Sequence, residues 1–147
     1  MSSDAPVLRQ AVAADWSAVE ELLAANQLPL EGARQHLDSF IVAAQHGRLL
    51  GCIGLERYGD AGLLRSCAVA DTDRGGGIGA LLTKALIDGA RRAGVKQLVL
   101  LTTTAENYFA RFGFVQISRD AIPAALQDSA EFRGACPASA TAMQLVL

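Results

Sequence analysis

Short runs of apolar residues, separated by turn-forming residues, dominate the first half of the chain. Runs typical of β-strands cover residues 7–11, 40–45, 48–58 and 61–70. His46-Gly47 separates the second run from the third, and Gly59-Asp60 separates the third from the fourth. Because two-residue turns of this kind join neighbouring antiparallel strands, the last three runs are predicted to form an antiparallel meander.

Helical spacing of apolar residues flanks this meander on both sides. A first helix is predicted from one apolar face, formed by Trp16, Val19, Leu22 and Leu23. A second helix is predicted to run from Ile78 to a stop at Gly94. Its buried face would consist of Ile78, Leu81, Leu82, Ala85, Leu86 and Gly89.

Two pairs of polar residues have the spacing of a helix capping box. Ser17 and Glu20 could cap the first helix, and Thr103 and Glu106 could cap a third, shorter helix. Further strands are predicted at residues 97–101, 114–118 and 141–147, and loops with short helices at residues 28–39 and 119–139. This order of elements predicts an α+β fold with a mixed central sheet, in a single domain over residues 1–147.

Net charge, cysteine count and the distribution of apolar residues limit the kinds of partner, metal site and location that the sequence supports. The chain has 147 residues, is 51% hydrophobic and 19% charged, and carries a formal net charge of −2. This charge gives no electrostatic reason to expect nucleic acid or an anionic membrane as partner. Three cysteines at wide spacing argue against a disulfide framework and a zinc cluster, so no metal is expected. With no apolar signal or membrane segment, a cytoplasmic location is predicted.

The chemistry of the chain centres on "DTDRGGGIGALL", residues 71–82. A strand, a glycine turn and a helix start together form an anion site of backbone N–H groups. A P-loop is excluded because Ala80, not lysine, follows Gly79. A dinucleotide fingerprint fits only weakly, since the next strand ends in threonines rather than an acidic residue. The third interpretation is the turn of acyl-CoA-dependent acetyltransferases, and a glycine turn without a ligand is the structural alternative.

Four segments around this turn support the acetyltransferase interpretation. They are "LLRSCAV", "RGGGIGALL", "LVLLT" and "AENYFARFGF". With them the chain resembles the GNAT superfamily of N-acetyltransferases over nearly its full length. The segments "LLRS", "LLTTTAENYF" and "EFRGACPASATAM" are similar to the branch of small acetyltransferases associated with arsenic-resistance operons.

The resemblance implies a mostly antiparallel sheet that splays after its fourth strand, with helices on both faces. It also implies acetyl-CoA as co-substrate. The residues expected to hold its pyrophosphate are Arg74, Gly75, Gly76, Gly77, Gly79 and Ala80. The pantetheine arm would pair with the free strand edge near Cys67 and Val69. Asn107 is expected either to touch the pantetheine or to face solvent.

The resemblance also implies direct attack of a neutral amine on the thioester. A backbone N–H near Val69 is the expected oxyanion donor. Many relatives protonate the leaving thiolate with a tyrosine, but Phe109 occupies that position here. Tyr108 lies roughly 100° away around the helix. Packing is therefore favoured over proton donation for Tyr108, and the thiolate is expected to leave unassisted or with help from water.

The acceptor site is sought on the strands that face the acyl group. With a two-residue turn at Gly59-Asp60, Glu56 lies opposite Leu63 and shares a face with Arg65. Glu56 is the candidate base and Arg65 the candidate clamp for a substrate carboxylate. The alternative is an ion pair on a solvated face. Ser66 lies on the other face unless a bulge turns it.

Further acceptor and partner assignments complete the prediction. Arg119 is a second, weaker candidate clamp, and His36 and His46 are expected to be exposed. The predicted acceptor is a small, carboxylate-bearing primary amine, acetylated to detoxify it. The alternatives are a catalytically weak domain that senses acyl-CoA, a protein or peptide N-acetyltransferase, and an interaction module. A homodimer is left open.

Overall fold

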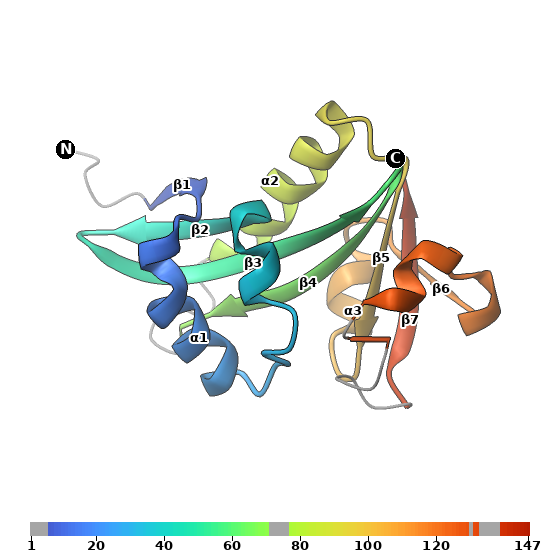
Figure 1. Cartoon of the computed structure of the whole chain (residues 1–147), viewed down its shortest axis with the longest axis horizontal. Helices are drawn as coiled ribbons and strands as arrows, with labels where there is room; N and C mark the ends of the chain where they lie inside the picture. The colour runs from blue at the N-terminus through green and yellow to red at the C-terminus, as the bar shows by residue number, and fades with distance from the viewer. Residues whose placement is uncertain (1–5, 71–76, 130, 133–138) are drawn as a thin grey trace.

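The computed structural model describes residues 6–70, 77–129, 131–132 and 139–147. A seven-stranded sheet forms the centre of the molecule, in the order β1-β2-β3-β4-β5-β7-β6 (Figure 1). The strands are β1 (Val7–Gln10), β2 (Phe40–Gln45), β3 (Arg48–Tyr58), β4 (Ala61–Val69), β5 (Gln97–Thr102), β6 (Val115–Ile117) and β7 (Thr141–Val146). Among the described strands only the β4–β5 pair is parallel, so the predicted mixed, mostly antiparallel sheet is confirmed.

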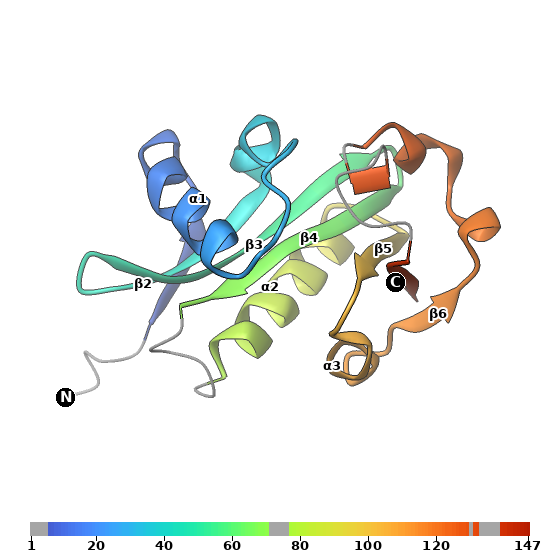
Figure 2. The same ribbon diagram turned by 90° about the horizontal axis from the view of Figure 1, so that it is seen from below.

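Helices cover both faces of the sheet (Figure 2). The α-helices are α1 (Trp16–Ala25), α2 (Ile78–Arg92) and α3 (Glu106–Ala110). The 3-10 segments are η1 (Ala13–Asp15), η2 (Arg34–Ser39), η4 (Arg119–Ala121) and η5 (Ala124–Asp128). Helix α1 packs with Phe40, Val42 and Cys52 on one face, whereas α2 packs with Leu50, Ile53 and Leu64 on the other.

Strands β4 and β5 separate like the arms of a fork (Figures 1 and 2). Their pairing ends at Leu63 and Val99, although β4 continues to Val69 and β5 to Thr102. The edge of β4 beyond Leu63 is therefore not paired with β5. This is the splay that the sequence predicted after the fourth strand.

A β-bulge lies in this free part of β4. Gly54 pairs with Arg65 and Cys52 with Ala68, so Ile53 alone faces two residues of β4. Ser66, one of those two, has a φ of +61°, which is rare for a residue with a side chain. The bulge changes the side to which Ser66 points. The sequence predicted Ser66 on the face of Arg65 only if such a bulge is present, and the Ser66 hydroxyl does accept a hydrogen bond from Arg65.

Helix details differ from the prediction at several positions. Leu81 is 47% exposed, and the buried face of α2 instead includes Thr83, Ile87 and Ala90. The predicted stripe was displaced around the helix because the strands beneath it, β2, β3 and β4, and not periodicity alone, decide which side is covered. Among the described residues no helix is long and apolar enough to cross a membrane.

Neither predicted capping box forms. Helix α1 begins at Trp16, one residue before Ser17, and Asp15 stands at its N-cap position. Asp15 is held there by an ion pair with Arg9 at 2.8 Å. At α3 the hydroxyl of Thr102, not Thr103, accepts a hydrogen bond from Ala105 N–H at 2.9 Å. A two-residue shift in each N-cap position was enough to displace the predicted cap.

Candidate active site

The start of α2 lies beside the open end of β4. Gly77 is the N-cap residue, with a φ of +82°, and its carbonyl accepts the Leu81 N–H at 3.0 Å. The N–H groups of the first helical turn have no partner within the helix, so they are available to an anion. The predicted pyrophosphate residues Arg74, Gly75 and Gly76 lie outside the described residues.

A cavity of about 510 Å³, here called the α2 cavity, adjoins this helix start. Its wall contains Cys67, Val69, Gly77, Gly79, Ala80 and Tyr108. A Cβ atom added at Gly79 would lie 3.0 Å from the Tyr108 hydroxyl oxygen and 3.6 Å from the Val69 side chain. Glycine at this position therefore keeps the passage between α2, β4 and α3 open.

The backbone of β4 presents hydrogen-bonding groups to the fork. Ala70 N–H donates to the Leu50 carbonyl at 2.8 Å, toward β3. Because backbone groups alternate sides along a strand, the N–H groups of Val69 and Cys67 point to the other side, where β5 has separated. Asn26 of the segment after α1 donates a long hydrogen bond, 3.4 Å, to the Val69 carbonyl.

A second cavity, about 570 Å³, fills the fork on the other side of this edge and is here called the fork cavity. Its wall includes Pro29, Arg65, Ser66, Thr103, Glu131 and Ala140. The two cavities share four lining residues, Asn26, Cys67, Ala105 and Phe109. They therefore meet at the open edge of β4.

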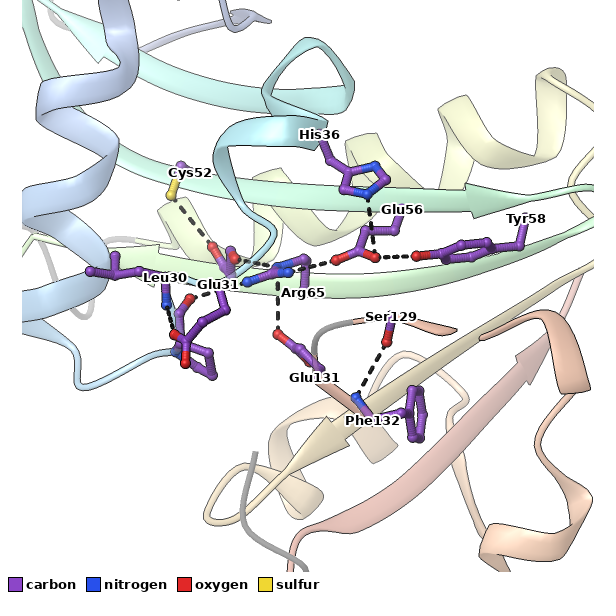
Figure 3. A network of polar contacts seen from close by, with 12 residues as sticks. Leu30, Glu31, His36, Cys52, Glu56, Tyr58, Arg65, Ser129, Glu131 and Phe132 are labelled. Atoms are coloured by element: carbon purple, nitrogen blue, oxygen red, sulfur yellow. Dashed lines mark hydrogen bonds and ion pairs between the residues drawn. The ribbon is translucent and has the colours of Figure 1, made fainter. Parts of the chain in front are cut away.

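A buried charged cluster stands at the fork cavity (Figure 3). At its centre the Arg65 side chain has 0% exposure and donates from Nη1 to Glu56 Oε2 at 2.5 Å. Arg65 Nε donates to the Ser66 hydroxyl at 3.0 Å, and Nη2 to the Pro29 carbonyl at 3.1 Å. Glu131 Oε2 lies 3.5 Å from Arg65 Nε. The guanidinium thus joins β3, β4, the segment after α1 and the C-terminal segment.

Glu56 is enclosed by this cluster. Its Oε1 accepts the Tyr58 hydroxyl at 2.5 Å and lies 3.5 Å from His36 Nε2. The Glu56 side chain is 1% exposed. The predicted register, with Glu56 opposite Leu63 and on one face with Arg65, is confirmed. The ion pair of the alternative interpretation also forms, but both of its side chains are buried, so the solvated face of that alternative is wrong. His36, expected to be exposed, is half-buried against Glu56 instead.

A family model described as an acetyltransferase (GNAT) domain matches residues 36–116, more than half of the chain. The chain belongs to the GNAT acetyltransferase family. This confirms the superfamily that the glycine turn and its neighbouring segments predicted. The narrower resemblance to the arsenic-resistance branch stays a prediction.

Several curated proteins that this chain resembles are named amino-acid acetyltransferases. That of Neisseria meningitidis is 33% identical over 95 residues, which cover 63% of this chain and 22% of the relative. The chain thus spans about a fifth of the length of that relative. The amino-acid acetyltransferase of Mycobacterium tuberculosis is 33% identical over 131 residues, covering 86% of this chain and 72% of the relative.

Solved structures give the same fold. N-acetylglutamate synthase from Neisseria gonorrhoeae, complexed with coenzyme A and N-acetyl-glutamate, has a TM-score of 0.83 and 26% identity over 97% of this chain and 35% of that one. A Mycobacterium tuberculosis protein in complex with CoA also has a TM-score of 0.83, with 27% identity over 97% of this chain and 99% of that one. The GNAT fold predicted from the sequence is therefore confirmed.

Within this GNAT fold, Tyr108 lies differently from the prediction. Its ring packs at 5.0 Å from Phe109 and 5.3 Å from Phe112, as expected of a packed aromatic. Its hydroxyl nevertheless reaches the α2 cavity, is buried, and makes no hydrogen bond with the described residues. Because α3 is short and lies close to α2, a turn of 100° on the helix did not take the hydroxyl away from the cavity.

The ionisation of Tyr108 follows from this burial. Burial raises the pKa of the phenol, and the nearby Thr83 hydroxyl partly opposes that rise. The Thr83 hydroxyl donates its own proton to the Gly79 carbonyl at 2.8 Å. The phenol therefore keeps its proton at neutral pH and has that proton available for a ligand.

Cys67 lies where the α2 cavity and the fork cavity meet. Burial raises the pKa of its thiol to about 11, and the Thr83 hydroxyl, 3.9 Å from the sulfur, opposes the rise. Since the thiolate is the nucleophilic form, a thiol this weakly acidic is a poor acetyl carrier at neutral pH. This favours direct transfer to the amine over an acetyl-cysteine intermediate.

The remaining predicted site residues are less central. Asn107 is exposed and does not line either cavity. Arg119 is exposed and donates to the carbonyl of Ala140, which lies on the wall of the fork cavity, at 2.9 Å. Their roles stay predictions. The described residues contain no group of three His, Cys, Asp or Glu side chains placed to hold a metal ion.

Sequence reasoning missed three residues of the site. Asn26 ends α1, and an asparagine there is explained by helix capping alone. Glu131 lies in the segment "EFRGACPASATAM", and nothing in the sequence around it predicts a contact with Arg65. His36 was expected to be exposed, and its contact with Glu56 joins residues that are 20 positions apart. A larger hollow, about 920 Å³, lies between α1 and the β2–β3 turn, away from the fork, and no ligand is assigned to it.

Proposed function

We propose that the protein is an acetyl-CoA-dependent N-acetyltransferase whose acceptor is the primary amine of a small, carboxylate-bearing molecule of the amino-acid type. The observation that carries this proposal is the meeting of the α2 and fork cavities at the open edge of β4. One cavity offers a helix N-terminus to an anion, and the other offers a buried charged cluster. A donor and an acceptor entering from opposite sides would meet at Cys67.

Acetyl-CoA would occupy the α2 cavity. Its pyrophosphate would bind the first-turn N–H groups of α2, next to Gly77, Gly79 and Ala80. Its pantetheine amides would pair with the free backbone groups of Cys67 and Val69, as an added strand would. The thioester oxygen would then approach the Val69 N–H, the candidate oxyanion donor.

The acceptor would enter the fork cavity. Arg65 and Ser66 form part of its wall, and Arg119 borders it through Ala140. The relatives named as amino-acid acetyltransferases favour a free amino acid, or a molecule that mimics one, over a protein N-terminus. Detoxification of such a mimic, including an arsenical amino acid, is the finer prediction from the sequence. A weak acyl-CoA sensor is the alternative from another class.

A thiol-release assay with a panel of amines tests the proposal. The panel contains glutamate and other amino acids, glutamate mimics, arsenical amino acids, polyamines and short peptides. We expect a carboxylate-bearing amino acid or mimic to give the highest kcat/KM, because the charged side chains of Arg65 and Glu131 form part of the wall of the fork cavity. If acetyl-CoA raises the melting temperature of the protein but no amine causes thiol release, the protein is an acyl-CoA sensor. If peptides or polyamines are the best acceptors, the proposed substrate class is wrong.

Replacement of Tyr108 by phenylalanine tests for a general acid. The hydroxyl lies at the α2 cavity, so we expect kcat to fall about 10- to 100-fold, near the lower end of general-acid contributions. Phe109→Leu is the control, because it alters the neighbouring ring without removing a hydroxyl. A Tyr108→Phe enzyme with wild-type kcat would show that the thiolate leaves unaided, as the sequence predicted.

A further inference from the structure

Two carboxylates contact Arg65, and they differ in their access to the fork cavity. Glu56 has both oxygens engaged, Oε2 by Arg65 and Oε1 by Tyr58, with His36 nearby. Glu56 is not part of the cavity wall. A general base must lie within hydrogen-bond reach of the proton that it takes, or be linked to it by one water. Glu56 does not meet this requirement.

Glu131 occupies the opposite side of Arg65 (Figure 3). Its side chain is 4% exposed, and its Oε2 lies 3.5 Å from Arg65 Nε, which already donates to Ser66 at 3.0 Å. Unlike Glu56, it belongs to the wall of the fork cavity, together with Ser66 and Cys67. It is therefore the carboxylate of the described cluster that an acceptor in this cavity can touch.

We propose that Glu131 binds the ammonium group of the acceptor and takes its proton, and that Glu56 has the structural role of fixing Arg65. This inference rests on the proposed acetyltransferase function and names its general base. Arg65 contacts Glu131, and Glu56, Tyr58 and His36 lie behind Arg65. The titratable Cys67 lies on the same cavity wall as Glu131.

The proton and electron balance of the step is as follows. The ammonium group gives one proton to the Glu131 carboxylate and becomes a neutral amine. Its lone pair forms the new C–N bond at the thioester carbonyl, and the C–S bond breaks with its electron pair on sulfur. The second amine proton ends on the thiol of CoA. Glu131 then releases its proton to solvent, so one proton is produced in each turnover.

The test compares Glu131→Gln with the wild type in the thiol-release assay from pH 6.5 to 10, with the amine that the panel selects. At pH 7 we expect kcat/KM for the amine to fall about 100-fold or more, the usual contribution of a general base. The deficit should shrink as the pH approaches the pKa of the amine itself, because the free amine then forms without the enzyme. Acetyl-CoA affinity should change less than twofold, which also reports an intact fold.

Two further variants keep the inference falsifiable. Glu131→Asp retains a carboxylate and should keep the wild-type pH profile at reduced kcat/KM. Glu56→Gln removes the same charge from the other side of Arg65 and should lose stability, with less than about tenfold loss of kcat/KM and no recovery at high pH. A Glu131→Gln enzyme with the wild-type profile, or a deficit of Glu56→Gln that recovers at high pH, would overturn the assignment.

Failure of the inference and failure of the proposed function give different results. A wild-type chain that acetylates no amine in the panel would overturn the function and the inference together. An active wild type whose kcat/KM and pH profile are unaffected by Glu131→Gln would overturn the inference alone.

Discussion

Gly77→Asp is expected to abolish acetyl-CoA binding while the fold survives. Gly77 is the N-cap residue of α2, and a Cβ atom added there would meet no atom of the described residues within 4 Å. Aspartate tolerates a positive φ better than most residues, so we expect the unfolding free energy to change by less than about 1 kcal/mol. Its carboxylate, however, would stand where we propose that the pyrophosphate binds, and repulsion at this short range should weaken acetyl-CoA binding at least about 100-fold.

Thermal and denaturant unfolding with and without acetyl-CoA would show the effect. At a ligand concentration of 100 times the wild-type Kd, the wild type should gain about 2.7 kcal/mol of stability and a variant bound 100-fold more weakly only about 0.4 kcal/mol. Gly77→Asn is the matched control, since it adds a side chain of the same shape without the charge, and it should keep most of the gain. Unchanged affinity in Gly77→Asp would place the cofactor elsewhere.

Arg65→Ala is expected to remove about 3–5 kcal/mol of stability, the usual result of breaking a buried ion pair from one side. The reason is that the Glu56 carboxylate, 1% exposed, would be left buried without the guanidinium that contacts it at 2.5 Å. The Pro29 carbonyl would lose its donor as well. Since a domain of this size is stable by about 5–15 kcal/mol, the variant should unfold at clearly lower urea concentration.

Two controls separate pairing from a general effect of charge. Arg91→Ala breaks the exposed pair with Asp88, whose side chains are 56% and 60% exposed, and should cost less than about 1 kcal/mol. The double variant Arg65→Met with Glu56→Leu should be more stable than Arg65→Ala, because it removes both charges. If Arg65→Ala unfolds at the wild-type urea concentration, the buried cluster around Arg65 does not stabilise the packing of the fork-cavity walls against β4.

Several features of this site were accessible from local sequence patterns. The Gly59-Asp60 turn set the register of β3 and β4, in which Glu56 lies opposite Leu63. Arg65 lies opposite Gly54, two pairs further along the same strands. Alternation along two strands joined by a short turn is enough to predict such a contact. The glycines before α2 likewise predicted a helix start approached closely by a ligand, because that property depends only on neighbouring residues.

Other features depended on segments that are distant in sequence. Tyr108 reaches Gly79 because α3 and α2 pack on the same face of the sheet, so the helical angle alone misplaced its hydroxyl. Leu81 was expected inside α2 and is exposed, since the covered side of a helix depends on the tilt of the strands beneath it.

The sequence by itself determined the strands of the meander, the glycine start of α2, the fold family and the β3–β4 register that places Glu56 and Arg65 on one face. Each follows from residues that are near in the chain or joined by one short turn. Only the tertiary structure decided which carboxylate meets the fork cavity, because Glu131 reaches Arg65 from a segment 66 positions later in the chain. Long-range contacts of this kind are fixed by the packing of the whole sheet and its covering segments, and no local period encodes them.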